Sequence, residues 1–299
     1  MPPITLETTH LTKKFGALTA LNDICLQVNQ GEVFGYIGPN GAGKTTTIRL
    51  LLGILRATSG SAKVFGMDAW KQAVEIHRRI AYVPGDVNLW PNLTGGEVID
   101  LFVRLRGSQD RQRREKLLAM FELDPSKKCR AYSKGNRQKV ALVAAFASEA
   151  ELYILDEPTS GLDPLMELVF QECVLEQKRQ GKGVFLSSHI MSEVERLCDR
   201  VGIIREGQLA ETGTLSQLRH LTRVTMTVET EAPLDNPASL PGVHATERAN
   251  AGWTFQVDSD DVGAVISAIA PLGITKLESM PPTLEDLFMR HYSAPSGEK

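Results

Sequence analysis

A glycine-rich segment, set between an apolar run and a helix-forming run, constrains this chain more than any other feature. The segment fits the pattern G-x-x-x-x-G-K-[ST] and reads Gly38, Pro39, Asn40, Gly41, Ala42, Gly43, Lys44, Thr45. Residues 33–37 before it are apolar, and residues 46–52 after it favour a helix. The segment therefore predicts a buried strand that enters a tight loop and a helix that leaves it, as in a parallel α/β sheet.

Such a loop binds phosphate. Its glycines let the backbone curl so that successive N–H groups point inward at an anion, and the helix adds about half a positive charge at its N-terminus. In this pattern Lys44 reaches the β- and γ-phosphates of a nucleoside triphosphate, and the Thr45 hydroxyl ligates Mg²⁺. We expect residues 38–45 and the next residue, Thr46, to bind the nucleotide.

A second apolar run ends in two carboxylates. Residues 152–155 read as a buried strand, and Asp156 and Glu157 follow it directly. At the carboxyl end of a strand, Asp156 can hold Mg²⁺ through water. Glu157 is placed to polarise an attacking water, because γ-phosphate hydrolysis depends on positioning and charge stabilisation. Together with Lys44, the pair predicts hydrolysis of a bound triphosphate.

Residues 156–164 and 186–189 resemble the Walker B motif, the D-loop and the switch histidine of ABC-family ATPases, in a match that covers about residues 4–215. The resemblance implies that ATP and Mg²⁺ are the cofactors and that Asp163 communicates across a head-to-tail dimer. It also implies that His189 contacts the γ-phosphate and that Phe15 stacks on adenine. A histidine donor can stabilise growing phosphoryl charge, and an aromatic face can pack on a purine.

The chain departs from the family at its signature segment. In place of the usual LSGGQ it has Tyr132, Ser133, Lys134, Gly135 and Asn136. A serine hydroxyl, a glycine amide and a helix beginning near Gly135 can still bind the γ-phosphate of ATP held by a partner subunit. Lys134 would add charge beside that phosphate, although a solvated lysine that points away fits the pattern as well.

A second departure follows the predicted strand at residues 80–83. Where the family commonly carries a glutamine that senses Mg²⁺, this chain has Gly85, which has no side-chain ligand. Either Asp86 is the metal ligand instead, or water completes the metal shell. Residues 89–94 form a candidate groove edge for the coupling helix of a partner, with aromatic packing inside the subdomain as the alternative.

The order of apolar strands and helices predicts an α/β fold. We expect a P-loop NTPase parallel sheet, an antiparallel β subdomain near the N-terminus and a helical signature subdomain at about residues 86–150, all within an ATP-binding domain of residues 1–222. Residues 69–79 and 164–180 read as helices. A small α+β extension at residues 223–299 carries predicted helices at 260–270 and 283–292 and suggests a ferredoxin-like βαββαβ arrangement.

Composition narrows the choice of partners and compartment. The 299 residues carry a formal net charge of −3 without a long basic block, so nucleic acid is not expected as a main partner. Four cysteines lack metal-ligand spacing, and we expect ordinary buried thiols. No leader or membrane-spanning run is evident, which predicts a peripheral protein at the cytoplasmic face of the cell membrane.

The resemblance implies a motor subunit that closes as a homodimer or heterodimer around two ATP molecules and pulls on separate transmembrane permease subunits. The single nucleotide domain, with an extension that ends in residues 283–288, resembles ATPase subunits of two-component bacterial exporters of drugs, antibiotics or lipids. An importer's ATPase remains open as an alternative. A soluble ABC ATPase acting on ribosomes or DNA is disfavoured because a second nucleotide domain and long coiled coils are absent. A GTPase is disfavoured because [NT]-K-x-D is absent.

Overall fold

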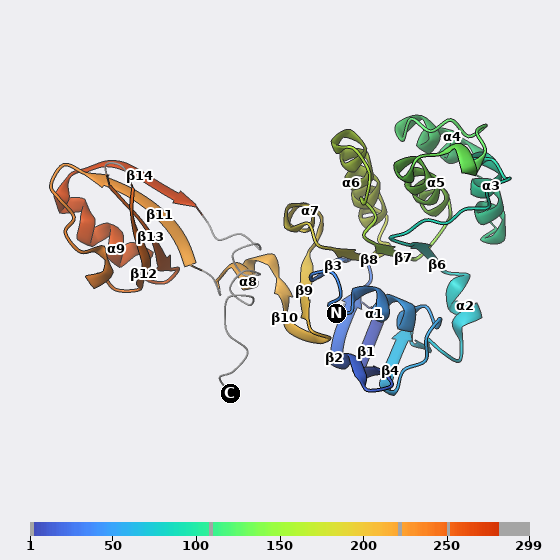
Figure 1. Cartoon of the computed structure of the whole chain (residues 1–299), viewed down its shortest axis with the longest axis horizontal. Helices are drawn as coiled ribbons and strands as arrows, with labels where there is room; N and C mark the ends of the chain where they lie inside the picture. Colours follow the sequence, from blue (N-terminus) through green and yellow to red (C-terminus); the bar gives the residue numbers. More distant parts are fainter. Residues whose placement is uncertain (1–2, 108–109, 221–222, 250–251, 281–299) are drawn as a thin grey trace. The chain divides into compact units, whose positions relative to one another are not determined.

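The chain forms two compact units. The computed structural model describes residues 3–107, 110–220, 223–249 and 252–280. Contacts between Cα atoms divide the chain into Met1–Thr212 and Gly213–Lys299, and each unit has sheets and helices of its own (Figure 1). The division lies earlier than the boundary that the sequence suggested after residue 222, because a helix at residues 215–220 is counted with the second unit.

A six-stranded sheet is the centre of the first unit. Its strand order is β10-β9-β3-β8-β7-β6, and the strands from β9 to β6 pair in parallel. The bounds are β3 Val33–Ile37, β6 Ile80–Val83, β7 Leu152–Asp156, β8 Gly183–Ser188, β9 Arg200–Arg205 and β10 Gln208–Thr214. Every residue of β3, β7 and β8 is buried, as expected for parallel strands covered on both faces.

Helices cover this sheet on both sides. Figure 1 shows α6 (Pro164–Arg179) and α7 (Met191–Leu197) on one face and α1 (Lys44–Leu51) on the other. Helix α1 also contacts an antiparallel sheet, whose strand order is β2-β1-β4-β5. The bounds of that sheet are β1 Ile4–Phe15, β2 Leu18–Asn29, β4 Ser59–Val64 and β5 Met67–Asp68. One apolar cluster joins the two sheets through α1 and fixes the loop that precedes this helix.

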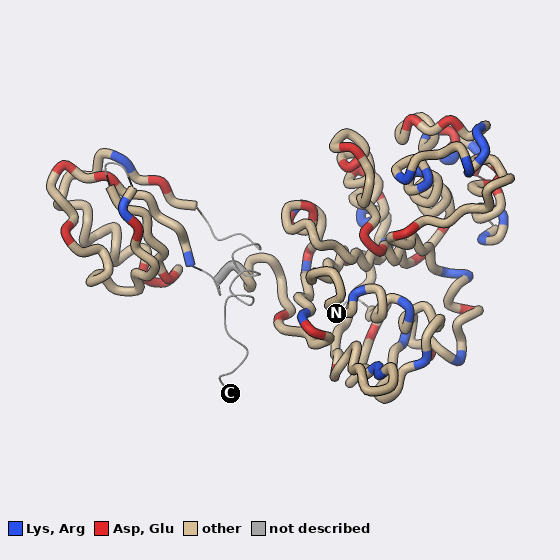
Figure 2. Tube along the Cα trace, viewed as in Figure 1, with Lys and Arg blue, Asp and Glu red and all other residues tan. Residues whose placement is uncertain are grey.

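A helical layer lies between β6 and β7 in the sequence. It contains α3 (Gly95–Leu105), α4 (Arg111–Met120) and α5 (Lys134–Phe146). Thr94 begins α3 with a capping box, because its hydroxyl accepts a hydrogen bond from Glu97 N at 3.1 Å while Glu97 Oε2 accepts one from Thr94 N at 2.7 Å. This layer carries both acidic and basic residues (Figure 2), and the charged residues of α5 are all basic.

The helix expected at residues 69–79 is shorter in the structure. Only Ala73–His77 is helical, as α2, because the segment before it forms a turn around Asp68. The Asp68 carboxylate accepts hydrogen bonds from the backbone N–H groups of Trp70 at 3.0 Å and Lys71 at 2.8 Å. This local hydrogen bonding competes with the helix, as short acidic side chains commonly do.

The second unit has one antiparallel sheet of order β12-β13-β11-β14. Its elements are α8 Leu215–His220, β11 Arg223–Thr230, β12 Val243–Ala249, β13 Gly252–Asp258, α9 Val262–Ile269 and β14 Ile274–Met280. Helix α9 packs its buried face on the apolar side chains of β11 and β13. In place of the first helix of a βαββαβ unit, only a 3₁₀ turn at Pro237–Ser239 joins β11 to β12. The helix expected at residues 283–292 lies outside the described residues.

The cysteines differ in exposure. Cys129, Cys173 and Cys198 are buried, but Cys25 on β2 is exposed, so the expectation of four buried thiols was wrong for this residue. Among the described residues, no helix combines the length and the apolar content that crossing a bilayer requires.

Candidate active site

The glycine-rich loop runs from β3 into α1, and two of its glycines are required by close packing. A Cβ on Gly38 would lie 2.4 Å from the Ile204 carbonyl oxygen, and one on Gly43 would lie 2.6 Å from Leu21 Cδ2. Gly43 also has a φ of 112°, which disfavours any side chain. Neighbouring strands β9 and β2 therefore fix the loop so tightly that only glycine fits at these two positions.

Lys44 lies buried beneath the loop. Its Nζ donates hydrogen bonds to the carbonyl oxygens of Gly38 at 2.6 Å and Pro39 at 3.1 Å. The same Nζ is 3.1 Å from Glu157 Oε1, at the end of β7. An ammonium group has three N–H donors, so these three oxygens match its full capacity. A phosphate that enters the loop must compete with them for Lys44.

Asp156 connects three elements at the carboxyl end of the sheet. Its Oδ2 accepts a hydrogen bond from the Thr45 hydroxyl of α1 at 2.9 Å, and its Oδ1 accepts one from the Ser187 hydroxyl of β8 at 2.6 Å. The carboxylate is 3% exposed and its orientation is fixed from both sides. A carboxylate and a hydroxyl are hard oxygen donors of the kind that Mg²⁺ prefers, so this pair fits the expected metal.

Glu157 follows Asp156 in an unusual backbone conformation. Its φ of 46° lies in the left-handed region, which is rare for a glutamate. Its backbone N–H donates to the Ser187 carbonyl oxygen at 3.0 Å, which anchors this turn to β8. The turn places the side chain between Lys44 and His189, whose Nδ1 is 3.4 Å from Glu157 Oε2. Lys44, Glu157 and His189 thus come from three elements to one point.

The signature segment lies on a different surface. Ser133 is the N-cap of α5, and its hydroxyl accepts a hydrogen bond from Asn136 N at 3.2 Å. A Cβ on Gly135 would be 2.4 Å from the Gly161 carbonyl oxygen, and Lys134 Nζ donates to the Ser160 hydroxyl at 3.0 Å. The segment therefore packs on the turn after β7. In the described part of the chain, no hydrogen bond or ion pair joins it to the phosphate loop.

Three other expected residues lie apart from this group. Asp163 is the exposed N-cap of α6 and accepts a hydrogen bond from Met166 N at 3.0 Å. Phe15 ends β1 with a 45% exposed ring, and Lys13 Nζ lies 4.8 Å from the ring centroid. Asp86 is exposed and makes no hydrogen bond or ion pair with the described residues. Gly85 lies closer, since a Cβ there would be 3.1 Å from the Asp156 carbonyl oxygen.

Sequence reasoning missed two polar residues near the site. Ser187, which holds Asp156, is a hydroxyl at the carboxyl end of an apolar strand, and that placement was a usable signal. Glu193 of α7 is 5% exposed, and its Oε2 accepts a hydrogen bond from the Ser188 hydroxyl at 2.6 Å. Burial raises the pKa of Glu193, although the hydroxyls of Ser188 and Thr159 oppose the rise.

An apolar cavity of about 120 Å³ lies in the helical subdomain. Trp90 forms part of its wall with an indole that is 52% exposed, and its ring centroid is 6.3 Å from that of Phe102 on α3. The wall also includes Tyr82 of β6 and, after the carboxyl end of that strand, Pro84 and Leu89. The segment that carries Gly85 therefore connects this cavity to the end of β7.

Two family models match the chain. The model described as "ABC transporter" matches residues 21–160. The model described as "ATP-binding protein DrrA1-3-like, C-terminal domain" matches residues 213–292. The first match covers the phosphate loop, the signature segment and the acidic pair, and the second covers most of the second unit.

Relatives match over the same regions. The ABC transporter ATP-binding protein YhaQ of Bacillus subtilis is 32% identical over 296 residues, which are 95% of this chain and 97% of the relative. The bacitracin transport ATP-binding protein BcrA of Bacillus licheniformis is 36% identical over 73% of this chain and 72% of its own length. An ABC transporter ATP-binding protein of Synechocystis is 39% identical, and the match spans 58% of its length. A solved structure described as "Structure of ATP binding subunit of ABC transporter" aligns with a TM-score of 0.68 and 35% identity, covering 73% of this chain and 92% of that one.

Proposed function

This chain belongs to the ABC transporter ATP-binding family of ATPases, and we propose that it is the motor subunit of a transporter that exports drugs, antibiotics or lipids through separate membrane subunits. The main support for this proposal is that four side chains come together at the carboxyl edge of one parallel sheet. They are Lys44, Asp156, Glu157 and His189. That edge is where α/β sheets bind their ligands.

The proposed reaction is hydrolysis of ATP. Residues 38–46 bind the phosphates, and Lys44 exchanges its contact with Glu157 for phosphate oxygens when ATP enters. Glu157, released from Lys44, accepts a hydrogen bond from the attacking water and orients it toward the γ-phosphate. His189 donates to the γ-phosphate and stabilises the charge that develops there. The exposed ring of Phe15 stacks on the adenine.

Thr45 and Asp156 would hold Mg²⁺, which neutralises charge on the phosphates when bound. Their oxygens already face each other across 2.9 Å, and Ser187 fixes the second Asp156 oxygen. In our proposal the exposed Asp86 would contribute to holding Mg²⁺, because Gly85 beside it has no ligand to offer. Without such a contribution, water alone fills that position.

A second ATP-binding subunit completes each site. Ser133, Lys134, Gly135 and Asn136 stand at the N-terminus of α5, on a surface without a bond to the chain's own phosphate loop among the described residues. The N-terminus of a 13-residue helix is suited to an anion. These residues therefore contact the γ-phosphate of ATP held by the partner. Asp163, exposed on the adjoining turn, is placed to reach across the same interface.

Permease subunits dock at the helical subdomain in this proposal, which places the chain at the cytoplasmic face of the membrane. The apolar cavity beside Trp90 can receive an apolar side chain of a coupling helix. Because residues 83–86 connect this cavity to the end of β7, closure around ATP can move the docked helix. The names of relatives, bacitracin transport for BcrA among them, support export of a drug-like or antibiotic cargo.

The test is the variant Glu157→Gln. We expect it to bind MgATP, to lose hydrolysis by about 100-fold or more, and to form an ATP-dependent dimer in light scattering. The control is Glu151→Gln, which removes a carboxylate just before the same strand, where Glu151 pairs with Arg79 on the surface at 2.7 Å. This control should hydrolyse ATP at the wild-type rate.

Pull-down from native membranes tests the partner. With MgATP, the Glu157→Gln dimer should retain a membrane protein, and Trp90→Ala should lose that protein while hydrolysing ATP in isolation. Retention of ribosomes instead of a membrane protein would contradict the transporter assignment. Wild-type hydrolysis by Glu157→Gln would contradict the proposed role of the carboxylate.

A further inference from the structure

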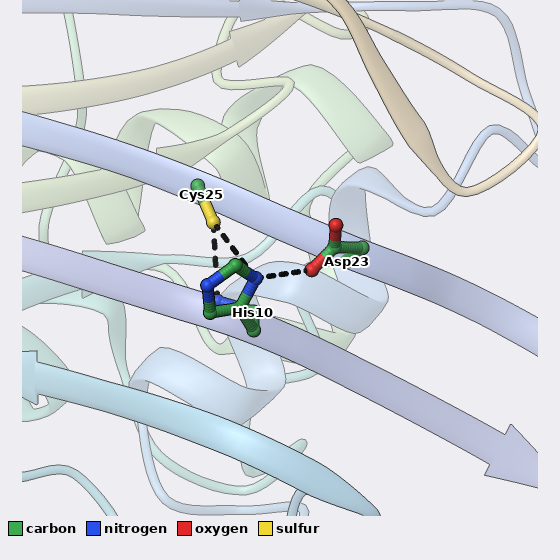
Figure 3. Close-up of side chains that lie close together, drawn as sticks. All are labelled: His10, Asp23 and Cys25. Atoms are coloured by element: carbon green, nitrogen blue, oxygen red, sulfur yellow. Dashed lines mark hydrogen bonds and ion pairs between the residues drawn. The ribbon is translucent and has the colours of Figure 1, made fainter.

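Three side chains with metal-binding atoms gather on the antiparallel sheet. His10 comes from β1, and Asp23 and Cys25 come from β2 (Figure 3). His10 Nδ1 is 2.6 Å from Asp23 Oδ1 and 3.8 Å from Cys25 Sγ, and all three ligand atoms lie within 4.8 Å of one another. The nucleotide mechanism uses none of them. In Figure 3 the imidazole lies between the thiol and the carboxylate.

Two β-bulges create this arrangement. Between the pairs Thr8↔Leu26 and Leu11↔Ile24, two residues of β1 oppose the single residue Cys25 of β2. Between Leu11↔Ile24 and Lys13↔Leu21, two residues of β2 oppose one of β1. A bulge redirects side chains that a regular ladder would point elsewhere, and such irregularities commonly lie next to functional sites.

The bulged residues adopt costly backbone conformations. His10 has a φ of 49° and Asp23 a φ of 61°, both in the left-handed region. Both residues are strained relative to ordinary strand geometry. The sheet therefore holds one imidazole and one carboxylate beside Cys25 in a backbone conformation that lowers local stability. A plain surface ion pair would not require that conformation.

Cys25 is suited to metal binding, unlike the other cysteines. It is the exposed thiol of the four, and its sulfur accepts a hydrogen bond from the His10 backbone N–H at 3.1 Å, so a cation can reach it beside the imidazole. Burial raises the pKa of Cys129, Cys173 and Cys198, which keeps those thiols protonated. Metal cations bind thiolates rather than thiols.

One separation between ligand atoms already matches a tetrahedral zinc site. Zn²⁺ binds sulfur at about 2.3 Å and nitrogen or oxygen at about 2.0–2.2 Å, so ligand atoms around one ion lie about 3.3–3.6 Å apart. The separation of His10 Nδ1 from Cys25 Sγ, 3.8 Å, is close to this value. The 2.6 Å contact between His10 and Asp23 lengthens when the ion replaces the proton between them. Solvent is available for a fourth ligand because all three residues are exposed.

We propose that His10, Asp23 and Cys25 form a binding site for a thiol-seeking divalent cation of the Zn²⁺ class, separate from the Mg²⁺ site. Thiolate and imidazole ligands disfavour Mg²⁺ and Ca²⁺, which prefer oxygen. Binding forms bonds from the ion to Sγ, Nδ1 and a carboxylate oxygen. It releases the Cys25 thiol proton to solvent, while the imidazole proton moves from Nδ1 to Nε2. No oxidation or reduction takes place.

Zinc competition with a chromophoric chelator tests the site on the full-length protein. Saturating Mg²⁺ is included so that zinc does not occupy the oxygen ligands of Thr45 and Asp156. We expect one zinc ion per chain, and a loss of affinity of at least about tenfold in both Cys25→Ser and Asp23→Asn, because even partners that only orient a ligand contribute that much. His244→Gln is the matched control. It removes a His–Asp pair of 2.9 Å that has no cysteine, and it should leave zinc affinity unchanged.

Two direct readouts accompany the titration. Zn²⁺ should protect Cys25 from alkylation, and Co²⁺ should give the absorption band of a thiolate–cobalt bond that Cys25→Ser lacks. Circular dichroism of each variant verifies that it is folded. Equal zinc affinity in wild type, Cys25→Ser and Asp23→Asn would overturn the proposal, as would alkylation of Cys25 at the same rate with and without zinc.

Discussion

At the scale of the residue, the buried acid Glu193, four positions after His189, makes the stability of the folded chain depend on pH. Its carboxyl group holds the Ser188 hydroxyl, which in turn accepts a hydrogen bond from Ile190 N at 3.0 Å. The segment that carries His189 is therefore tied to α7 through a buried acid. Glu193 faces the charges of Glu157 and Glu167, and both disfavour its ionisation.

Glu193→Gln should become more stable relative to wild type as pH rises. Because the folded-state pKa of Glu193 is raised above its ordinary value of 4.5, the folded chain binds more protons there than the unfolded chain. Its contribution to stability is full below the unfolded pKa and is lost as pH rises through the folded pKa. Glutamine stays neutral at every pH. The unfolding free energy of the variant minus that of wild type should therefore increase as pH rises from the unfolded-state pKa to the folded-state pKa of Glu193. Urea titrations measure this difference.

The substitution also lowers the free energy of unfolding by an amount that does not depend on pH. Glu193 Oε1 has no hydrogen-bond partner among the described residues, so the amide nitrogen of glutamine at that place costs about 1–3 kcal/mol at every pH. The matched control is Glu195→Gln, which makes the same charge change on the same helix. An identical pH trend in both variants would show that burial of Glu193 is not the cause.

At the scale of the element, Thr94 and Ser133 are side-chain caps of two packed helices, α3 and α5. Thr94→Ala and Ser133→Ala should each lower the free energy of unfolding by about 1 kcal/mol, because each leaves a backbone N–H without its acceptor. Only Ser133→Ala should also reduce ATP hydrolysis, since the Thr94 hydroxyl is not among the proposed phosphate contacts. Urea unfolding and a steady-state ATPase assay check the pair.

Equal loss of hydrolysis in both cap variants would mean that helix stability, and not the Ser133 hydroxyl, limits the reaction. Equal hydrolysis in Ser133→Ala and wild type would contradict the contact to a partner's γ-phosphate. The stability loss common to both variants acts as the internal reference.

Elements that are marked by an uninterrupted run of residues and an adjacent motif were predictable from the sequence. The strands at residues 33–37 and 152–155 are plain apolar runs, and the loop and acidic pair follow them directly, so Lys44, Asp156 and Glu157 could be placed at one sheet edge. The clustering of three side chains on the antiparallel sheet, His10, Asp23 and Cys25, was not predictable. The alternation of residues along the strands does not indicate the two bulges that bring them together. The turn around Asp68 that shortens α2 was missed for a related reason, since side-chain acceptors act locally against the helical pattern.

At the scale of the whole molecule, the two units have separate hydrophobic cores. Phe255 is fully buried in the second, and Phe185 is fully buried in the first, where its ring centroid lies 5.4 Å from that of Tyr36 on β3. Phe255→Ala and Phe185→Ala should each destabilise their own unit by about 3–5 kcal/mol. Only Phe185→Ala should weaken ATP binding, because β3 leads into the phosphate loop.

Thermal unfolding with and without MgATP checks this prediction. In Phe255→Ala, ATP should still raise the midpoint of the first unit by the wild-type amount, because every residue proposed to contact ATP precedes residue 213. Loss of that rise in Phe255→Ala would show that the second core supports the nucleotide site.

The second unit was the less predictable part of the molecule. Its strands are short and partly exposed, so the sequence pattern did not indicate how β11 connects to β12. Pro237 begins the 3₁₀ turn there, and a fixed proline ring with few apolar neighbours in sequence favours a turn over the helix of a βαββαβ unit.

The left-handed backbone of Glu157 implies a conflict between selection for activity and selection for stability. A glycine would adopt the φ of 46° without strain, yet it would remove the carboxylate that lies between Lys44 and His189. Relief of that strain is worth about 1–2 kcal/mol, which offsets the cost of leaving one N–H donor of the buried Lys44 without its acceptor, so an inactive protein of comparable stability is one substitution away. A screen of random variants for thermal resistance alone would therefore retain non-hydrolysing mutants at this position, and thermostabilisation of the chain needs a simultaneous requirement for turnover.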